Sequence, residues 1–120
     1  MRRITYRGQV VALVVNGDLA IFSREVEERG ADDPLFRFAA AMCRLAMELE
    51  LGLETGRYDE ERAEGYARDL LMPADCFAAL AALPDAYLAT CFGVPAEQIA
   101  ARRAELGLGP LAPGGDCRTG

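Results

Sequence analysis

Residues with strand-forming character are confined to the beginning of this chain, and this division constrains its fold more than any other feature. The stretch RRITYRGQVVALVVNGDLAIFSREV, residues 2–26, is rich in Val, Ile and Leu, which fit the pleated surface of a sheet. Arg7-Gly8 and Asn16-Gly17 interrupt it, and Asn-Gly is typical of a two-residue hairpin turn. The pattern predicts two or three antiparallel strands, at about 2–7, 9–15 and 18–23.

The remainder of the chain has helical signals. Asp33 and Pro34 form an N-cap and a first helical residue, and apolar residues then recur at spacings of three and four as far as Gly52. Further helical segments follow, and Gly107 is typical of a helix C-terminus. The predicted helices cover about 34–51, 59–72, 74–82, 85–92 and 95–106. We therefore expect an α+β protein in which a small antiparallel N-terminal sheet is followed by four or five helices.

Length and composition indicate one globular domain. The chain has 120 residues, 52% of them apolar and 27% charged, which is enough to bury a core without disulfides or metals. We expect a single domain over residues 1–108 and a flexible, Gly- and Pro-rich tail over 109–120. We expect no signal peptide, because a polar-punctuated strand follows the MRR start, and no apolar run is long enough to span a membrane. The expected location is the cytoplasm, without a membrane partner.

The residue types of the chain exclude most catalytic chemistry. It contains no His, and its four Cys form no C-x-x-C pair, so we predict no metal site and no cofactor. No phosphate-binding or dinucleotide-binding motif occurs, and a Cys nucleophile would lack a His base. Cys43, Cys76 and Cys91 lie in apolar segments and are predicted to be small buried residues, whereas Cys117 is predicted to be exposed. The net charge of −6 opposes a surface that grips nucleic acid.

Two sequence motifs resemble those of a known protein family. A-x-x-x-A-x-x-LLMP, at Ala63, Ala67 and Leu70 to Pro73, precedes LATCFGVPAEQIAARRAELGL at 88–108. Together they resemble the ImmA/IrrE family of metallopeptidase-like regulators, and FRFAAAM at 36–42 is similar to that family's zinc-binding helix. The resemblance covers about residues 8–108. It implies a zincin-like scaffold and a protein partner, such as a bacterial helix-turn-helix repressor of a phage or mobile element.

The resemblance also shows what has been lost. The two His ligands of the HExxH motif fall on Met42 and Ala46, its catalytic Glu falls on Cys43, and the third ligand falls at or beside Arg62. Met, Cys, Ala and Arg at these positions cannot together hold a zinc ion and activate a water bound to it. The chain is therefore expected not to be an enzyme. A pseudopeptidase can retain its groove for binding, and the candidate groove residues are Met42, Cys43, Ala46, Glu61, Arg62 and Tyr66.

The segment 85–106 has a second interpretation. Ala89, Gly93 and Ile99 occupy positions suited to a helix-turn-helix, whose second helix reads DNA with residues such as Gln and Arg. The candidate nucleic-acid contacts are Gln98, Arg102 and Arg103. The alternative is a purely structural helix pair, which Pro95 at the cap position and acidic residues in the second helix favour.

Three classes of function therefore remain open. The leading prediction is a non-catalytic regulatory or adaptor module that binds a protein, with a repressor as the partner that the resemblance implies. The first alternative is a DNA-binding transcriptional regulator that uses the helix pair 85–106. The second is an unconventional metalloprotein that combines Cys43 with Glu61 or Glu64, although solvated glutamates beside a core cysteine are the simpler interpretation.

Overall fold

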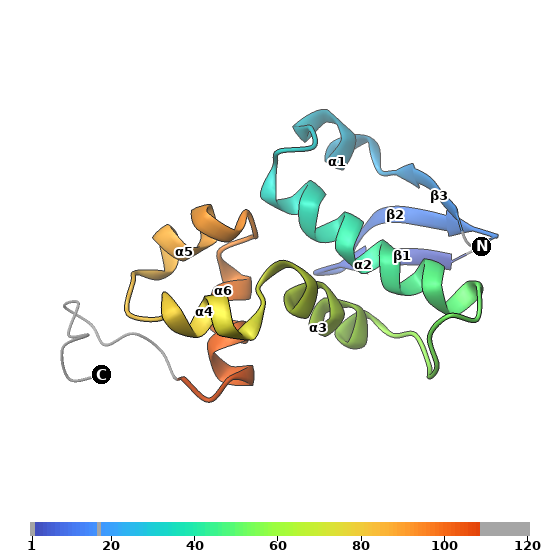
Figure 1. Ribbon diagram of the computed structural model, residues 1–120. Helices are drawn as coiled ribbons and strands as arrows, with labels where there is room; N and C mark the ends of the chain where they lie inside the picture. Colours follow the sequence, from blue (N-terminus) through green and yellow to red (C-terminus); the bar gives the residue numbers. More distant parts are fainter. Residues whose placement is uncertain (1, 17, 109–120) are drawn as a thin grey trace. The chain divides into compact units, whose positions relative to one another are not determined.

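The computed structural model describes residues 2–16 and 18–108. Its described part is α+β, as predicted, with a three-stranded antiparallel sheet that precedes all of the helices (Figure 1). The described residues form six helices, so the predicted number of four or five is too low. In chain order the elements are β1 (Arg2–Tyr6), β2 (Gln9–Val15), β3 (Asp18–Phe22), α1 (Arg24–Arg29), α2 (Pro34–Glu50), α3 (Glu60–Leu71), α4 (Ala74–Ala79), α5 (Asp85–Phe92) and α6 (Glu97–Glu105).

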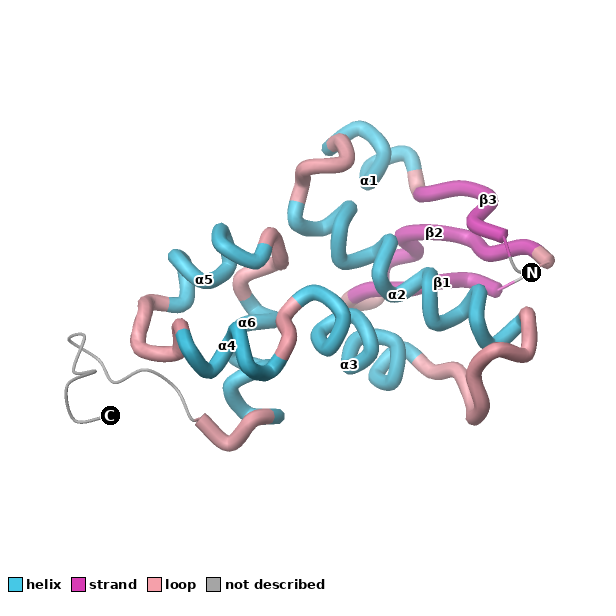
Figure 2. The backbone as a smooth tube through the Cα atoms, viewed as in Figure 1, coloured by secondary structure: helices cyan, strands magenta, loops and turns pink. Residues whose placement is uncertain are grey.

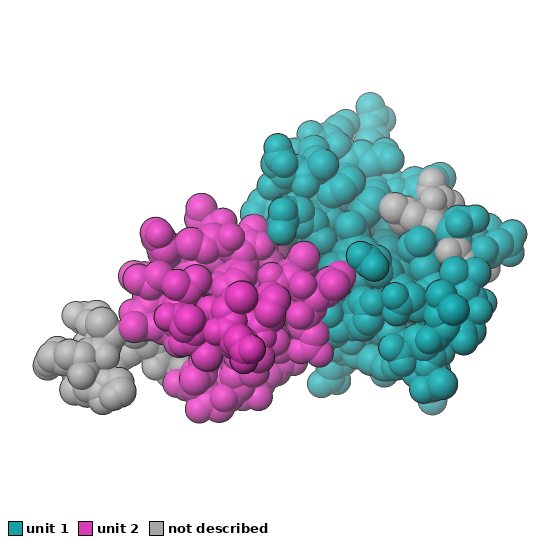
Figure 3. All heavy atoms as spheres, viewed as in Figure 1, with its two compact units in different colours: residues 1–67 teal, residues 68–120 magenta. Residues whose placement is uncertain are grey.

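The chain divides into two compact units, Met1–Ala67 and Arg68–Gly120 (Figure 3). Helix α3 begins in the first unit and ends in the second. Whether residues 1–108 behave as one domain stays a prediction. Gly17, the expected tail at 109–120 and Cys117 lie outside the described residues. No helix within the described ranges combines the length and the apolar character needed to cross a membrane.

The sheet of the first unit is a meander in the order β1-β2-β3 (Figure 2). Arg7 and Gly8 join β1 to β2 with positive φ angles of 52° and 83°, which is the backbone of a type I′ hairpin turn. A β-bulge interrupts the β1–β2 register between Ile4 and Thr5. The predicted strands therefore appear with their ends shifted by at most one residue.

Helix α2 packs against all three strands and covers one face of the sheet (Figures 1 and 2). The Tyr6 ring meets the Phe38 ring edge-on at 5.5 Å, and Phe22 stacks on Phe36 at 4.4 Å. Burial of apolar side chains between sheet and helix is the main source of stability in such a layer. The buried residues of β1, β2 and α2 include Ile4, Val11, Ala12, Val14, Phe38, Ala39, Met42, Leu45 and Ala46.

Helix α1 is the element that the sequence pattern did not predict. Ser23 is its N-cap and accepts a hydrogen bond from the Val26 amide at 3.4 Å. Glu25 and Glu27 lie in its first turn, where the helix dipole favours carboxylates. Only Val26 of this helix is buried, so the segment shows no apolar period. A helix of six residues is too short to be recognised in the sequence from its apolar periodicity.

The second unit contains the end of α3 and helices α4, α5 and α6. Its core is built from Met72, Phe77, Leu88, Val94 and Ile99, all at most 1% exposed. Gly93 ends α5 in the left-handed conformation, with φ 65° and ψ 43°, which costs glycine little because it has no Cβ. The predicted helix pair therefore exists, over Asp85–Phe92 and Glu97–Glu105.

Candidate protein-binding face

The residues aligned with a zinc-binding motif lie in the core of the first unit. Met42 and Ala46 are 0% exposed and Cys43 is 1% exposed. Burial raises the pKa of the Cys43 thiol from 9.0 to about 12, so the thiol stays protonated near neutral pH. A neutral buried thiol is neither a nucleophile nor a metal ligand. These three side chains pack the helix and line no open groove.

Arg62 and Tyr66 have structural partners inside the first unit. The Arg62 guanidinium donates to the carbonyls of Thr55 at 2.7 Å and Arg57 at 3.2 Å, and it forms an ion pair with Glu54 at 3.4 Å. These bonds hold the loop that follows α2. The Tyr66 hydroxyl donates to a Glu48 carboxylate oxygen at 2.9 Å and so joins α3 to α2.

Glu61 lies apart from these contacts, in a surface hollow of about 430 Å³. The residues that line this hollow are Arg7, Gly8, Glu60, Glu61 and Glu64. Glu60 joins α3 to the sheet, since its carboxylate accepts from the Thr5 hydroxyl at 3.2 Å and the Arg7 amide at 3.0 Å. The six predicted groove residues are therefore not brought together on one surface.

The predicted nucleic-acid contacts are buried in the second unit. Gln98, Arg102 and Arg103 are 0%, 4% and 3% exposed. Arg102 donates to the Met72 carbonyl at 2.8 and 3.0 Å. Gln98 accepts from Arg68 at 2.9 Å. Side chains held in this way do not reach base edges or phosphates.

Arg103 has the same role at the next helix end. Its guanidinium donates to the carbonyls of Ala81 at 2.8 Å and Leu83 at 3.0 Å, and to the Asp85 carboxylate at 2.9 Å. The ring of Phe77 lies 5.9 Å from its central carbon. The arginine thereby satisfies carbonyls that follow α4, which otherwise lack helical partners.

The charge of the second unit also differs from that of a DNA-binding surface. Within residues 68–108 the basic residues are Arg68, Arg102 and Arg103, and each is bonded to a carboxylate or carbonyl of the same unit. The acidic residues in this range are Asp69, Asp75, Asp85, Glu97 and Glu105. Affinity for nucleic acid rests on Lys and Arg side chains that neutralise phosphates. In the structure these three arginines therefore bond to groups of the second unit itself and not to phosphates.

The prediction that Cys76 and Cys91 are buried is wrong. Both are exposed on the second unit, although their apolar surroundings in sequence predicted burial. Cys76 precedes the buried Phe77, and Cys91 precedes Phe92, whose ring stacks on Phe77 at 5.7 Å. The helix periodicity places the two rings inward and the adjacent thiols outward. Among the residues described, no three His, Cys, Asp or Glu side chains are grouped to hold a metal ion.

The most distinctive surface is the face of the sheet opposite α2, which we call the outer face. Ile21 directly precedes the buried Phe22 in β3 and is paired with Leu13, while Val10 of β2 is paired with Thr5. Since neighbouring residues of a strand point to opposite faces, these side chains point away from α2. Val10 is 41% exposed and Ile21 is 55% exposed. The outer face therefore presents apolar side chains from two adjacent strands.

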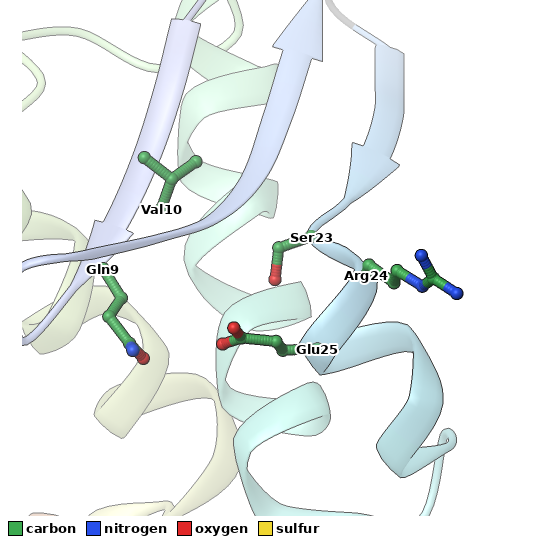
Figure 4. Close-up of a pocket in the computed structure, with 5 residues that line it drawn as sticks. All are labelled: Gln9, Val10, Ser23, Arg24 and Glu25. Carbon is green, nitrogen blue, oxygen red and sulfur yellow. The ribbon is translucent and has the colours of Figure 1, made fainter.

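A hollow of about 280 Å³ adjoins this face where β2 begins and α1 starts (Figure 4). The Ser23 hydroxyl and the Glu25 carboxylate point toward the same space, whereas Arg24 points away from it (Figure 4). The lining residues are Gln9, Val10, Ser23, Arg24 and Glu25. An apolar surface rimmed by polar groups is characteristic of protein-binding sites.

Sequence reasoning missed the outer face, although one signal could have revealed it. From Val10 to Val15 the second strand reads VVALVV without a polar residue. A strand with one solvated face normally alternates apolar and polar residues, and a continuous apolar run is typical of a strand covered on both faces. In the structure α2 covers only one of them.

Comparisons with protein families, with curated proteins and with solved structures gave no match to this chain. The ImmA/IrrE resemblance therefore stays a prediction. The class that the fold defines is a small α+β protein with a three-stranded antiparallel meander and a helical second unit.

Proposed function

We propose that this chain is a non-catalytic regulatory or adaptor module that binds a protein partner through the outer face of its sheet. The observation that carries the proposal is the apolar run VVALVV at 10–15 of strand β2, which α2 covers on one face only. Val10 and Ile21 add exposed apolar surface to the same face. Burial of such surface is the main driving force of protein association.

The proposed absence of catalysis is supported by the state of the α2 residues. Met42 and Ala46 have no acidic or basic group, and Cys43 is held neutral by burial. A hydrolase needs an activated nucleophile or a metal-bound water with a general base. The partner would accordingly be bound and released without a covalent change.

For the partner we propose a helix-turn-helix repressor, which the ImmA/IrrE resemblance implies. Binding to a repressor would give the module its regulatory effect without contact to DNA. Direct DNA binding is not proposed, because Gln98, Arg102 and Arg103 bond to groups within the second unit. A metalloprotein role through Cys43 is not proposed either, because that thiol is buried and protonated.

The test is a binding experiment with matched surface variants. Purified chain would be titrated in solution with repressor proteins from its own genetic neighbourhood, and the affinity measured by titration calorimetry. Val10→Lys places a charge on the outer face beside the hollow, and we expect it to weaken binding by at least about tenfold. Leu53→Lys is the control, since Leu53 is 74% exposed in the loop after α2, outside the sheet.

Three results would contradict the proposal. The first is cleavage of a bound partner by the purified chain, which would show catalysis. The second is equal weakening by both lysine variants, which would place the contact elsewhere. The third is salt-dependent binding to DNA that persists when the outer face is substituted.

A further inference from the structure

The apolar side chains of the outer face form a column along β2. Val10, Leu13 and Val15 each adjoin a residue that is buried on the α2 side, Val11 or Val14. Because neighbouring residues of a strand point to opposite faces, the first three side chains lie on the outer face. At the usual rise of a strand, the run 10–15 is about 16 Å long.

On the β1 side the column is flanked by a positive charge. Arg3 is paired with Leu13, which is paired in turn with Ile21, so these three side chains form one row across the outer face. Arg3 is exposed, and none of the described residues forms an ion pair with it. Arg2 and Arg7, by contrast, are paired with glutamates. Arg3 is therefore available to a carboxylate of another molecule.

On the β3 side the column is flanked by negative charges. Asp18 is exposed and is paired with Val15 of β2. The Glu25 carboxylate points toward the hollow beside β2, whereas Arg24 points away from it and bonds to Glu28 at 3.1 Å (Figure 4). The outer face is thus an apolar column with a cation along one side and carboxylates along the other.

The dimensions of this face match those of one α-helix. On the opposite face α2 alone contacts all three strands. Adjacent strands lie about 4.8 Å apart, so the row from Arg3 to Ile21 spans about 10 Å, which is the diameter of a helix with its side chains. A column of about 16 Å corresponds to about three helical turns. An extended peptide would instead add at a strand edge, away from this column.

We propose that the outer face binds an amphipathic helix of the partner protein, with acidic residues along one flank of its apolar stripe and basic residues along the other. This inference rests on the proposed function and specifies the binding element of the partner. The apolar stripe, with its spacings of three and four residues, covers Val10, Leu13 and Val15. The acidic flank lies beside Arg3 and the basic flank beside Asp18, and this complementarity gives the contact its specificity.

The test uses a library of helices displayed on a rigid helical bundle, because an isolated helix of about three turns is marginal in water. Stripe positions are restricted to apolar residues, and flanking positions vary among Glu, Lys and Gln. The library is selected against the full chain, and helices that bind the Val10→Lys variant equally well are discarded. We expect the remaining helices to carry Glu along one flank and Lys along the other.

Reversal of the charge at Arg3 tests the positions of the flanks. Arg3→Glu should weaken the binding of a selected helix on the order of tenfold, because it places like charges together. Replacement of Glu by Lys along that flank of the helix should restore its affinity for the Arg3→Glu variant. Arg44→Glu is the matched control, since Arg44 is exposed on α2, which covers the opposite face. Circular dichroism verifies that each variant is folded.

Two results would overturn the proposal. One is a selection that gives no helix whose binding depends on Val10. The other is a set of selected helices that lack opposite charges on their two flanks or bind the Arg3→Glu variant as well as the natural chain.

The titration with repressor proteins separates this proposal from the proposed function. Weakening by Val10→Lys but not by Arg3→Glu would leave the proposed function intact and show that the partner does not present the helix proposed here. Equal binding of the repressor by the natural chain and by Val10→Lys would contradict the proposed function itself.

Discussion

The Arg102 guanidinium donates two hydrogen bonds to one main-chain carbonyl, that of Met72, at 2.8 and 3.0 Å. Met72 follows the last residue of α3 and precedes Pro73, so its carbonyl has no helical amide to accept from. Arg102 also pairs with Asp69 at 2.7 Å and Glu105 at 3.0 Å. Arg102, a candidate DNA contact under the alternative interpretation of the sequence, thus closes a helix end.

Substitution of Arg102 should therefore affect folding. Arg102→Ala leaves the Met72 carbonyl and the carboxylate of Glu105 without this partner, and we expect the free energy of unfolding to fall by about 3 kcal/mol. Arg102→Lys should recover only part of this, because an ammonium group cannot reproduce the planar fork of the guanidinium. Urea denaturation monitored by circular dichroism measures both values.

The control for this measurement is Arg44→Ala. Arg44 is exposed on α2, and its loss should change the free energy of unfolding by no more than about 0.5 kcal/mol. Equal effects of the Arg102 and Arg44 substitutions would show that the buried arginine has no special structural role.

Glu105 should make stability depend on acidity. Burial alone would raise its pKa, but hydrogen bonds from Arg68 and Arg102 outweigh that effect and hold the pKa of the carboxyl below its ordinary value of 4.5. The folded state therefore favours the ionised form. The contribution of Glu105 to the free energy of unfolding is fully present above about pH 5. It is lost as the pH falls through the lowered pKa of the folded state.

Unfolding by urea at a series of pH values from 7 downward measures this dependence. Glu105→Gln cannot ionise, so its stability should decline less on acidification than that of the natural sequence. Parallel curves for the two proteins would contradict the assignment. Glu97→Gln is a suitable comparison because Glu97 is an exposed glutamate in the first turn of the same helix.

Cys43 should resist modification in the folded protein. Its thiol is 1% exposed, and its pKa is raised to about 12 by burial, so neither access nor ionisation permits reaction with iodoacetamide. Cys76 and Cys91 are exposed and should react. Mass spectrometry of peptides from native and urea-unfolded protein identifies the labelled residues.

The same pKa shift makes the free energy of unfolding decrease at alkaline pH. The folded thiol keeps its proton until about pH 12, whereas the unfolded thiol releases it near 9.0. The contribution of the Cys43 thiol to the free energy of unfolding is therefore full below pH 9 and declines as the pH rises toward 12. Rapid labelling of Cys43 in native protein at pH 8 would show that α2 opens easily.

Local signals in the sequence predicted the strands and α2 well. The Asp33 side chain accepts from the Leu35 amide at 2.9 Å, as its predicted capping role requires. Alternation, turn residues and caps act within a few positions of one another, so they can be recognised along the chain. Helix α1 was missed because a single buried residue, Val26, produces no period.

Only the tertiary structure decided which polar side chains are buried. By residue type Gln98, Arg102 and Arg103 belong on a surface, and in the second unit carbonyls and carboxylates from distant positions surround them. A buried charge is stable only with such partners, and neither spacing nor composition shows where the chain will supply them. The sequence by itself determined the fold class and the absence of histidine chemistry, since both depend on which residues are present and on local periodicity. The open outer face and the buried arginines depend on which segments meet in space.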